Sequence, residues 1–341
     1  MGAPVEYTID NGFVAKKVLV RSYQSKSMRP EGSGGKALTL AVPSPPPAIS
    51  KLPVGDDPRS ETFYDPRAAD ALAQIAGWSY SDYMVLMDAL QHRGIVDSDA
   101  TISQVSVKNE AMLVVSTAFF IRSGDLGIIC FRGTEPSNAI NFLTDASCRP
   151  INFYSMGQVH GGFYRNVLAV WADLAGEVEA AISSGLKALY ITGHSLGAAM
   201  AVLAAATIFG DSAYSHWRRL FRGAYTYGQP MVGDEAFARS CARIEKAVFR
   251  HVYGHDLVPH LPPLTTGTFR HFGQEWRGGE QGWSPRSKRT TQVASVALSI
   301  PIGAAAWVIA QIPVLGWIRL PLSIDDHSPN SYLEAFRAAR T

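Results

Sequence analysis

The segment that most constrains the fold is Gly193-His194-Ser195-Leu196-Gly197, together with the runs on either side of it. The apolar run 188–192 predicts a buried strand, and the alanine-rich run 196–209 predicts a helix that packs closely on a sheet. A serine between two glycines at such a junction indicates a sharp turn with a strained backbone, because larger side chains two positions away would collide. We therefore expect Ser195 to be presented in the turn at the end of this strand.

The rest of the chain alternates between predicted strands and helices. Apolar residues at a spacing of three to four predict helices over 66–76, 81–93 and 163–184. Runs rich in Val, Ile and Phe predict strands over 112–121, 126–131, 224–227 and 248–253. This alternation predicts an α/β fold with a mostly parallel central sheet and helices on both faces.

Charge is scarce and unevenly distributed. Charged residues make up 18 % of the chain, where about 25 % is usual. Two long stretches contain no Asp, Glu, Lys or Arg: residues 188–210 (23 residues) and 290–318 (29 residues). The first contains the serine turn, so we interpret it as the middle of a sheet and not as a membrane span. The hydrophobic content of 47 % excludes a disordered chain, and the net charge of +2 argues against a nucleic-acid partner.

The N-terminal part differs from the rest. Asn11-Gly12 lies between two strand-like runs and favours a hairpin, and a proline-rich linker follows it, so residues 1–60 are interpreted as an extension. Lys16-Lys17 and Arg21 interrupt any apolar run of signal length, which makes a cytoplasmic location the expectation. The three cysteines lack metal-type spacing and imply no disulfide framework.

Five motifs occur in an order that resembles a known family: Phe131-Arg132-Gly133-Thr134, Val159-His160-Gly161-Gly162-Phe163, Gly193–Gly197, Tyr227-Gly228-Gln229-Pro230 and Asp256-Leu257-Val258-Pro259. Over roughly residues 62–335 this set resembles the class 3 (fungal-type) lipases of the α/β-hydrolase superfamily. The resemblance implies an α/β-hydrolase domain over 61–341, lipid ester substrates and no cofactor. It gives no counterpart for residues 272–322, which we interpret as an apolar insertion.

A nucleophilic serine needs a base and an acid that orients the base, and this fold places them in the order Ser, Asp or Glu, His. Asp256 follows the predicted strand 248–253, and the resemblance places the acid there. The rival Asp234 precedes a short predicted helix around 235–238 and is better explained as a turn residue.

Three histidines follow Asp256. His260 is only four residues away, too close to fold back onto the acid, and His271 is interpreted as a surface or strand position. His327 comes just before a predicted final helix that Ser328 caps and Pro329 begins. Because the fold presents its histidine in such a loop, we predict His327 as the base.

Donors for an oxyanion complete the predicted site. One is the backbone N–H of Leu196, and the resemblance places the second at Thr134, after the strand 126–131. His160-Gly161-Gly162 is the alternative, but it opens a helix, so His160 and Arg132 are interpreted as structural. His251 and His255 would share a face on a helix, but the segment that contains them and His260 is predicted as a strand followed by a loop, so no zinc site is expected.

The second uncharged stretch, 290–318, cannot simply cross a membrane. A single crossing would separate His327 from Ser195, and two crossings need about 40 residues. We expect a lid over the site or a monotopic membrane anchor, with an ordinary pair of core helices as the alternative. The segment 135–142, where fungal-type lipases carry a lid, is short and polar here. The residues expected to contact lipid are Ile300, Ile302, Trp307, Ile309, Leu315 and Trp317.

The combined expectation is a serine lipase that hydrolyses acylglycerol esters through an acyl-enzyme at a membrane or lipid-droplet surface, attached peripherally. A carboxylesterase for short soluble esters and a membrane-associated scaffold without activity are the alternatives. The oligomeric state is left open.

Overall fold

The structure is a computed structural model of residues 1–341, in which the described residues are 5–9, 13–20, 48, 64–109, 114–134, 149–263, 267–279, 282–286, 290 and 323–338. Of residues 5–9 and 13–20 only the backbone is described.

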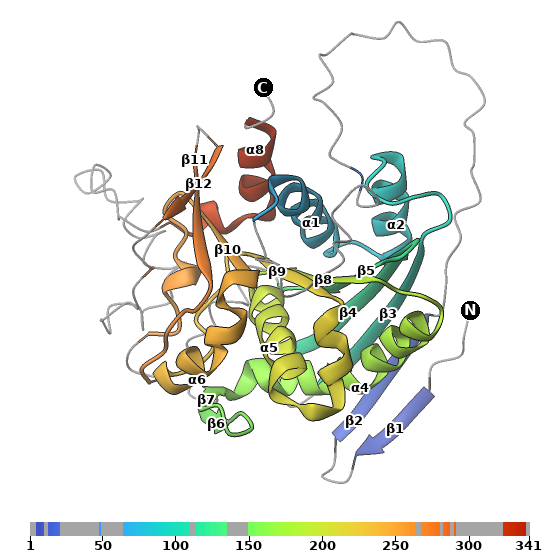
Figure 1. Cartoon of the computed structure of the whole chain (residues 1–341), viewed down its shortest axis with the longest axis horizontal. Coiled ribbons are helices and arrows are strands. Elements are labelled where there is room, and N and C mark those ends of the chain that lie inside the picture. The colour runs from blue at the N-terminus through green and yellow to red at the C-terminus, as the bar shows by residue number, and fades with distance from the viewer. Residues whose placement is uncertain are drawn as a thin grey trace, which may run out of the picture.

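A sheet of ten strands in the order β1-β2-β3-β4-β5-β8-β9-β10-β11-β12 forms the middle of the molecule (Figure 1). Its five central strands pair in parallel: β5 (Leu126–Phe131), β8 (Ala188–His194), β9 (Phe221–Tyr227), β10 (Val248–Tyr253) and β11 (Gln274–Gly279). Residues of β5 and β8 are buried throughout, as expected for strands covered on both faces. The mostly parallel central sheet is therefore confirmed.

Antiparallel strands extend the sheet at both edges. They are β1 (Val5–Ile9), β2 (Phe13–Val20), β3 (Thr101–Asn109) and β4 (Val114–Ser123) on one side and β12 (Gly282–Arg286) on the other. The pairing of β1 with β2 is the hairpin expected around Asn11-Gly12, and β2 joins it to β3. A separate two-stranded sheet pairs β6 (Pro150–Asn152) with β7 (Gln158–His160).

Helices cover both faces of the sheet (Figure 1). On one face lie α1 (Pro66–Trp78), α2 (Tyr83–His92) and α8 (Pro329–Ala338), and on the other α4 (Gly161–Ser183), α5 (Leu196–Gly210) and α6 (Glu235–Ser240). Short 3-10 helices connect them: η2 (Ser212–Arg219), η3 (Cys241–Ala247), η4 (Val258–His260) and η7 (Asp325–His327). Each face buries its own hydrophobic cluster, so the core has two layers with the sheet between them.

Local sequence explains where the helices begin. Asp65 accepts the backbone N–H of Arg67 at 2.8 Å and Pro66 occupies the first helical position, so α1 starts as its sequence predicts. His160 caps α4 by accepting the N–H of Phe163 at 3.2 Å.

The uncharged stretch 188–210 is the centre of the protein. Every residue of α5 from Leu196 to Ile208 is buried between the sheet and α4, which explains why no charge occurs there. Within the described part of the chain, no single helix is long and apolar enough to cross a membrane. Among the described helices, α5 and η2 taken together, with a bend of 104° between them, are the one pair that meets that length and composition test.

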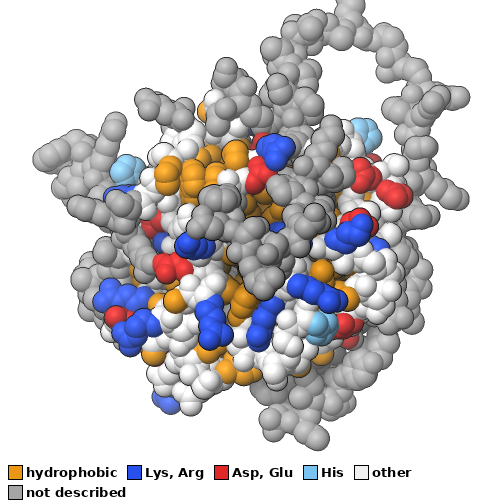
Figure 2. All heavy atoms as spheres, in the orientation of Figure 1, with side chains coloured by type: hydrophobic (Ala, Val, Ile, Leu, Met, Phe, Trp, Pro, Cys, Tyr) orange, Lys and Arg blue, Asp and Glu red, His pale blue; other side chains and the backbone are white. Residues whose placement is uncertain are grey.

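The face in Figure 2 carries basic and acidic side chains interspersed with one another. This distribution agrees with the near-zero net charge of the chain.

Candidate active site

Ser195 occupies the turn between β8 and α5. Its φ is +59° and its ψ is −126°, a conformation that residues with a side chain rarely adopt. The backbone N–H of Ser195 donates to the carbonyl of Tyr227 on β9 at 2.9 Å, which holds the turn against the neighbouring strand. The Ser195 side chain does not cap α5, so its hydroxyl is available for another partner.

The two glycines of the motif are required by close backbone contacts. A Cβ atom on Gly193 would lie 2.3 Å from the carbonyl oxygen of Gly197. A Cβ atom on Gly197 would lie 2.1 Å from the carbonyl oxygen of Phe131 at the end of β5. Any larger residue at either position would displace the turn that holds Ser195.

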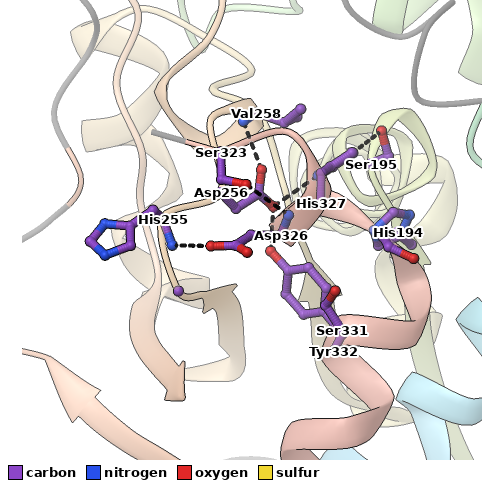
Figure 3. Close-up of polar contacts among 12 residues, drawn as sticks. His194, Ser195, His255, Asp256, Val258, Ser323, Asp326, His327, Ser331 and Tyr332 are labelled. Carbon is purple, nitrogen blue, oxygen red and sulfur yellow. Dashed lines mark hydrogen bonds and ion pairs between the residues drawn. The ribbon is translucent and has the colours of Figure 1, made fainter. Parts of the chain in front are cut away.

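Ser195, His327 and Asp256 form one chain of hydrogen bonds (Figure 3). Ser195 Oγ lies 2.7 Å from His327 Nε2, and His327 Nδ1 lies 2.8 Å from Asp256 Oδ2. A carboxylate only accepts, so Nδ1–H donates to Asp256, and in neutral imidazole Nε2 is then the acceptor for the Ser195 hydroxyl. The three side chains are fully buried, and the structure thus brings together the three residues predicted from sequence.

Asp256 has two further donors. Its Oδ1 accepts the backbone N–H of Val258 at 2.8 Å, and its Oδ2 accepts the hydroxyl of Tyr332 on α8 at 2.5 Å. Burial, with the adjacent Asp256 charge as the second cause, raises the pKa of Tyr332 well above its usual value. Tyr332 therefore keeps its proton and remains a donor to the same oxygen that His327 contacts.

Gly228 contacts both the base and the acid. Its φ is +58°, and a Cβ atom there would lie 2.7 Å from His327 Cε1 and 3.0 Å from Asp256 Oδ2. The motif Tyr227-Gly228-Gln229-Pro230 contributed to the family resemblance, but the sequence did not indicate this contact.

His194 and Tyr80 form a second polar pair beside the triad. Tyr80 Oη lies 2.8 Å from His194 Nδ1, and the His194 ring lies 4.6 Å from the ring of His327. Burial, with His327 as the next cause, holds the pKa of His194 well below its usual value, so this imidazole stays neutral. Tyr80 could not be predicted from the sequence, because it lies 114 residues before His194 and outside every motif.

The predicted oxyanion donors, Thr134 and Leu196, lie at the end of the sheet where Ser195 follows β8. Phe131 pairs with Gly193 in the register of β5 and β8, which places Thr134 near the turn that contains Leu196. Thr134 Oγ1 is buried, and among the described residues it has no hydrogen-bond partner. Leu196 begins α5, so its N–H belongs to the unsatisfied first turn of a helix. With respect to the described residues, both groups are therefore candidate donors to a bound oxyanion.

The alternative acid and the structural residues have the roles expected of them. Asp234 caps α6 and accepts the backbone N–H of Phe237 at 2.7 Å. Arg132 donates to the backbone carbonyls of Ser79 and Ser81, tying the loop after α1 to the end of β5.

The interpretation of His271 as a surface or strand position is wrong. His271 lies outside any strand and is 3 % exposed, with Nε2 2.8 Å from the carbonyl oxygen of Pro259. Its neighbours Arg270 and Phe272 suggested a surface or strand position, but the loop turns the imidazole inward, toward the carbonyl of Pro259 in η4.

A cavity of about 630 Å³ lies elsewhere, between α6, η3 and the segment around Phe269 and His271. None of its lining residues is Ser195, Asp256 or His327, so this cavity is separate from the candidate active site. Among the residues that the structure describes, no group of three His, Cys, Asp or Glu side chains could hold a metal ion.

Two predicted elements lie outside the described residues. They are the polar segment 135–142 and the six residues expected to contact lipid, Ile300, Ile302, Trp307, Ile309, Leu315 and Trp317.

The fold and the site together define the class: an α/β-hydrolase with a serine at its nucleophile elbow. Residues 128–266 match the model of the class 3 lipases, which supports the family resemblance that the motifs carried over this segment.

Two of the relatives are lipases that the chain covers only in part. A lipase of Rhizomucor miehei is 32 % identical over 191 residues, which are 53 % of this chain and 50 % of the relative. Secreted mono- and diacylglycerol lipase 1 of Fusarium solani is 37 % identical over 123 residues, 35 % of this chain and 33 % of the relative. The chain thus spans half or less of the length of these curated relatives.

Solved structures share the fold. The triacylglyceride lipase of Rhizomucor miehei aligns with a TM-score of 0.55 at 23 % identity, over 80 % of this chain and 96 % of that one. A triacylglycerol lipase whose catalytic centre is described as a serine protease triad aligns with a TM-score of 0.54 at 22 % identity, over 76 % and 91 %. The α/β-hydrolase fold is therefore confirmed.

Proposed function

We propose that this protein is a serine lipase that hydrolyses carboxylic ester bonds of acylglycerols. The observation that carries the proposal is the buried chain of hydrogen bonds from Ser195 through His327 to Asp256. The match of residues 128–266 to class 3 lipases and the mono- and diacylglycerol lipase among the relatives support a lipid ester as substrate.

In the proposed mechanism each group of the site has a step. His327 Nε2 takes the proton of Ser195 Oγ as the oxygen attacks the ester carbonyl, and Asp256 stabilises the imidazolium that forms. The N–H of Leu196 and the hydroxyl of Thr134 donate to the carbonyl oxygen as it becomes negative. His327 then protonates the leaving alcohol, and the C–O bond breaks to leave an acyl group on Ser195.

Water completes the cycle. His327 removes a proton from water as the water oxygen attacks the acyl carbonyl, and the proton is returned to Ser195 Oγ when the acid leaves. The reaction consumes one ester and one water and yields one alcohol and one carboxylic acid.

A chain-length series tests this function. Acylglycerols with acyl chains from four to eighteen carbons would be offered below and above their solubility limit, with Ser195→Ala as the control. We expect hydrolysis of emulsified long-chain esters, and a loss of at least about a thousandfold in the variant. Hydrolysis of short soluble esters alone would identify a carboxylesterase, and no hydrolysis at all would favour a scaffold without activity.

We also propose that the protein associates peripherally with a lipid surface through the uncharged segment 290–318. Support comes from the sequence, which places Trp307 and Trp317 in 29 residues without a charge. Co-sedimentation with phosphatidylcholine vesicles should fall in a Trp307→Ala, Trp317→Ala double variant. Equal sedimentation of variant and parent would contradict the proposal. The cytoplasmic location stays a prediction.

A further inference from the structure

The acid and the base of the proposed site are held on two short segments that pair with each other. The backbone N–H of Ser323 donates to the carbonyl of His255 at 2.7 Å, and the N–H of Leu257 donates to the carbonyl of Ser323 at 3.0 Å. Ser323 thereby forms a parallel bridge with Asp256. The segment that leads to His327 is thus aligned on the segment that contains Asp256.

Asp326, directly before His327, adds a side-chain contact to this pairing. Its Oδ2 accepts the backbone N–H of His255 at 2.7 Å, and its own N–H donates to Ser323 Oγ at 3.2 Å (Figure 3). The residue before the base is therefore bonded to the residue before the acid.

Gly254 provides the space for this carboxylate. Its φ is +46°, and a Cβ atom there would lie 2.5 Å from Asp326 Oδ2. On the other side of the loop, the N–H of Gly254 donates to the carbonyl of Gly278 at 3.0 Å, and Arg277 Nη1 donates to the carbonyl of Gly254 at 3.2 Å. The loop is therefore fixed to β11 and presents the N–H of His255 to Asp326.

We propose that Asp326 is a positioning residue, which sets the distance between His327 and Asp256 by binding the backbone of the acid's loop. This inference rests on the proposed function. Asp326 touches none of the reacting atoms and acts through the two segments that it joins. Because a shift of about 1 Å in a catalytic group can cost a hundredfold in rate, loss of this contact should reduce turnover more than substrate binding.

Three variants separate this role from a general effect of charge. Asp326→Ala removes the acceptor, and Asp326→Asn keeps an acceptor oxygen but removes the charge. Asp325→Ala is the matched control. The Asp325 side chain is exposed, and the hydrogen bond that Asp325 accepts from the N–H of Ser328 is made by its backbone carbonyl, which the substitution keeps. Each would be assayed with p-nitrophenyl butyrate, and its thermal midpoint would be measured.

Asp326→Ala should lower kcat about ten- to a hundredfold with KM within about twofold of the parent. Asp326→Asn should stay within about threefold, since its amide oxygen accepts the same N–H, and Asp325→Ala should match the parent. A folded Asp326→Ala with kcat within twofold of the parent, or an equal loss in Asp325→Ala, would overturn the inference. If Asp326→Ala does not fold, Ser323→Ala decides: we expect a several-fold loss of kcat, and an unchanged kcat overturns the inference.

Labelling of Ser195 by a fluorophosphonate distinguishes the two proposals. A parent protein that is neither labelled nor active contradicts the proposed function, and the role of Asp326 with it. A labelled and active parent whose Asp326→Ala variant is labelled equally fast contradicts the role of Asp326 alone.

Discussion

Gly228 and Gly124 have the same backbone conformation in different surroundings. Both have a φ of +58°, but a Cβ on Gly124 would meet nothing within 4 Å, whereas one on Gly228 would press on His327 and Asp256. Alanine in this region of φ costs about 1–2 kcal/mol. We expect both alanine variants to lose that much stability, while only Gly228→Ala loses activity, by about a hundredfold or more. Thermal unfolding and kcat/KM for a soluble ester would check this, and an active Gly228→Ala would contradict it.

Tyr332→Phe tests the third donor to Asp256. The change removes the 2.5 Å hydrogen bond and keeps the ring, which is 1 % exposed. A hydrogen bond to a charged group contributes about 1.5–3 kcal/mol, so kcat should fall about tenfold or more if this bond helps Asp256 to hold His327. Tyr253→Phe, in a half-buried ring that faces Tyr332, serves as the control and should keep full activity. Equal rates in Tyr332→Phe and the parent would show that Val258 and His327 suffice to hold the carboxylate.

At the scale of elements, a buried ion pair joins β10 to β11. Arg250 Nη2 lies 3.2 Å from Glu275 Oε2, and both side chains are fully buried. Glu275 also accepts from Arg277 at 3.0 Å and from the N–H of Thr290 at 2.7 Å. Burial lowers the pKa of Arg250 to about 10, so the guanidinium still carries its charge at neutral pH.

Glu275→Gln should therefore destabilise the protein by about 3–5 kcal/mol, because it leaves a buried charge without its counterion. Glu235→Gln, in an exposed pair with Arg239 on α6, is the matched control and should cost less than about 1 kcal/mol. Urea unfolding measures both, and similar losses in the two variants would contradict this account.

The elements that could be predicted from sequence are those with a continuous apolar pattern. The strand 126–131 and the strand 248–253 were predicted with their observed bounds, and α5 within one residue. β3 was missed because Ser103, Gln104 and Ser106 interrupt its apolar residues, and only pairing with β2 and β4 makes it a strand.

The residues of the site also differ in whether a local sequence pattern could predict them. Ser195 and Asp256 lie in local motifs, and His327 could be selected from three histidines by its place before a helix. The contacts of Tyr80 with His194 and of Asp326 with His255 join segments far apart in the chain, so no local pattern could predict them.

At the scale of the whole molecule, four buried histidines make stability depend on pH. Burial lowers the pKa of His160 and of His251 to about 3, and holds those of His194 and His271 well below their usual value. Below pH 6.5 the unfolded chain binds protons at these positions that the folded chain does not, down to about pH 3 for His160 and His251. Stability should therefore fall as pH falls below 6.5, by about 1.4 kcal/mol per pH unit for each histidine.

His160→Asn checks the sign and the size of this effect. Asparagine can still cap α4, but it does not titrate. The free energy of unfolding, measured between pH 7.5 and 5, should fall less steeply in the variant, by about 1.4 kcal/mol per pH unit in the lower part of the range. A slope equal to that of the parent would show that His160 is not buried in its neutral form.

The account rests on Ser195 being a nucleophile activated by His327. The most direct measurement is the rate at which a fluorophosphonate labels the folded protein, with the modified residue located by mass spectrometry. We predict a single adduct on Ser195, absent from Ser195→Ala and formed at least about a thousandfold more slowly in His327→Ala. A protein that is not labelled, or a His327→Ala variant labelled as fast as the parent, would contradict the account.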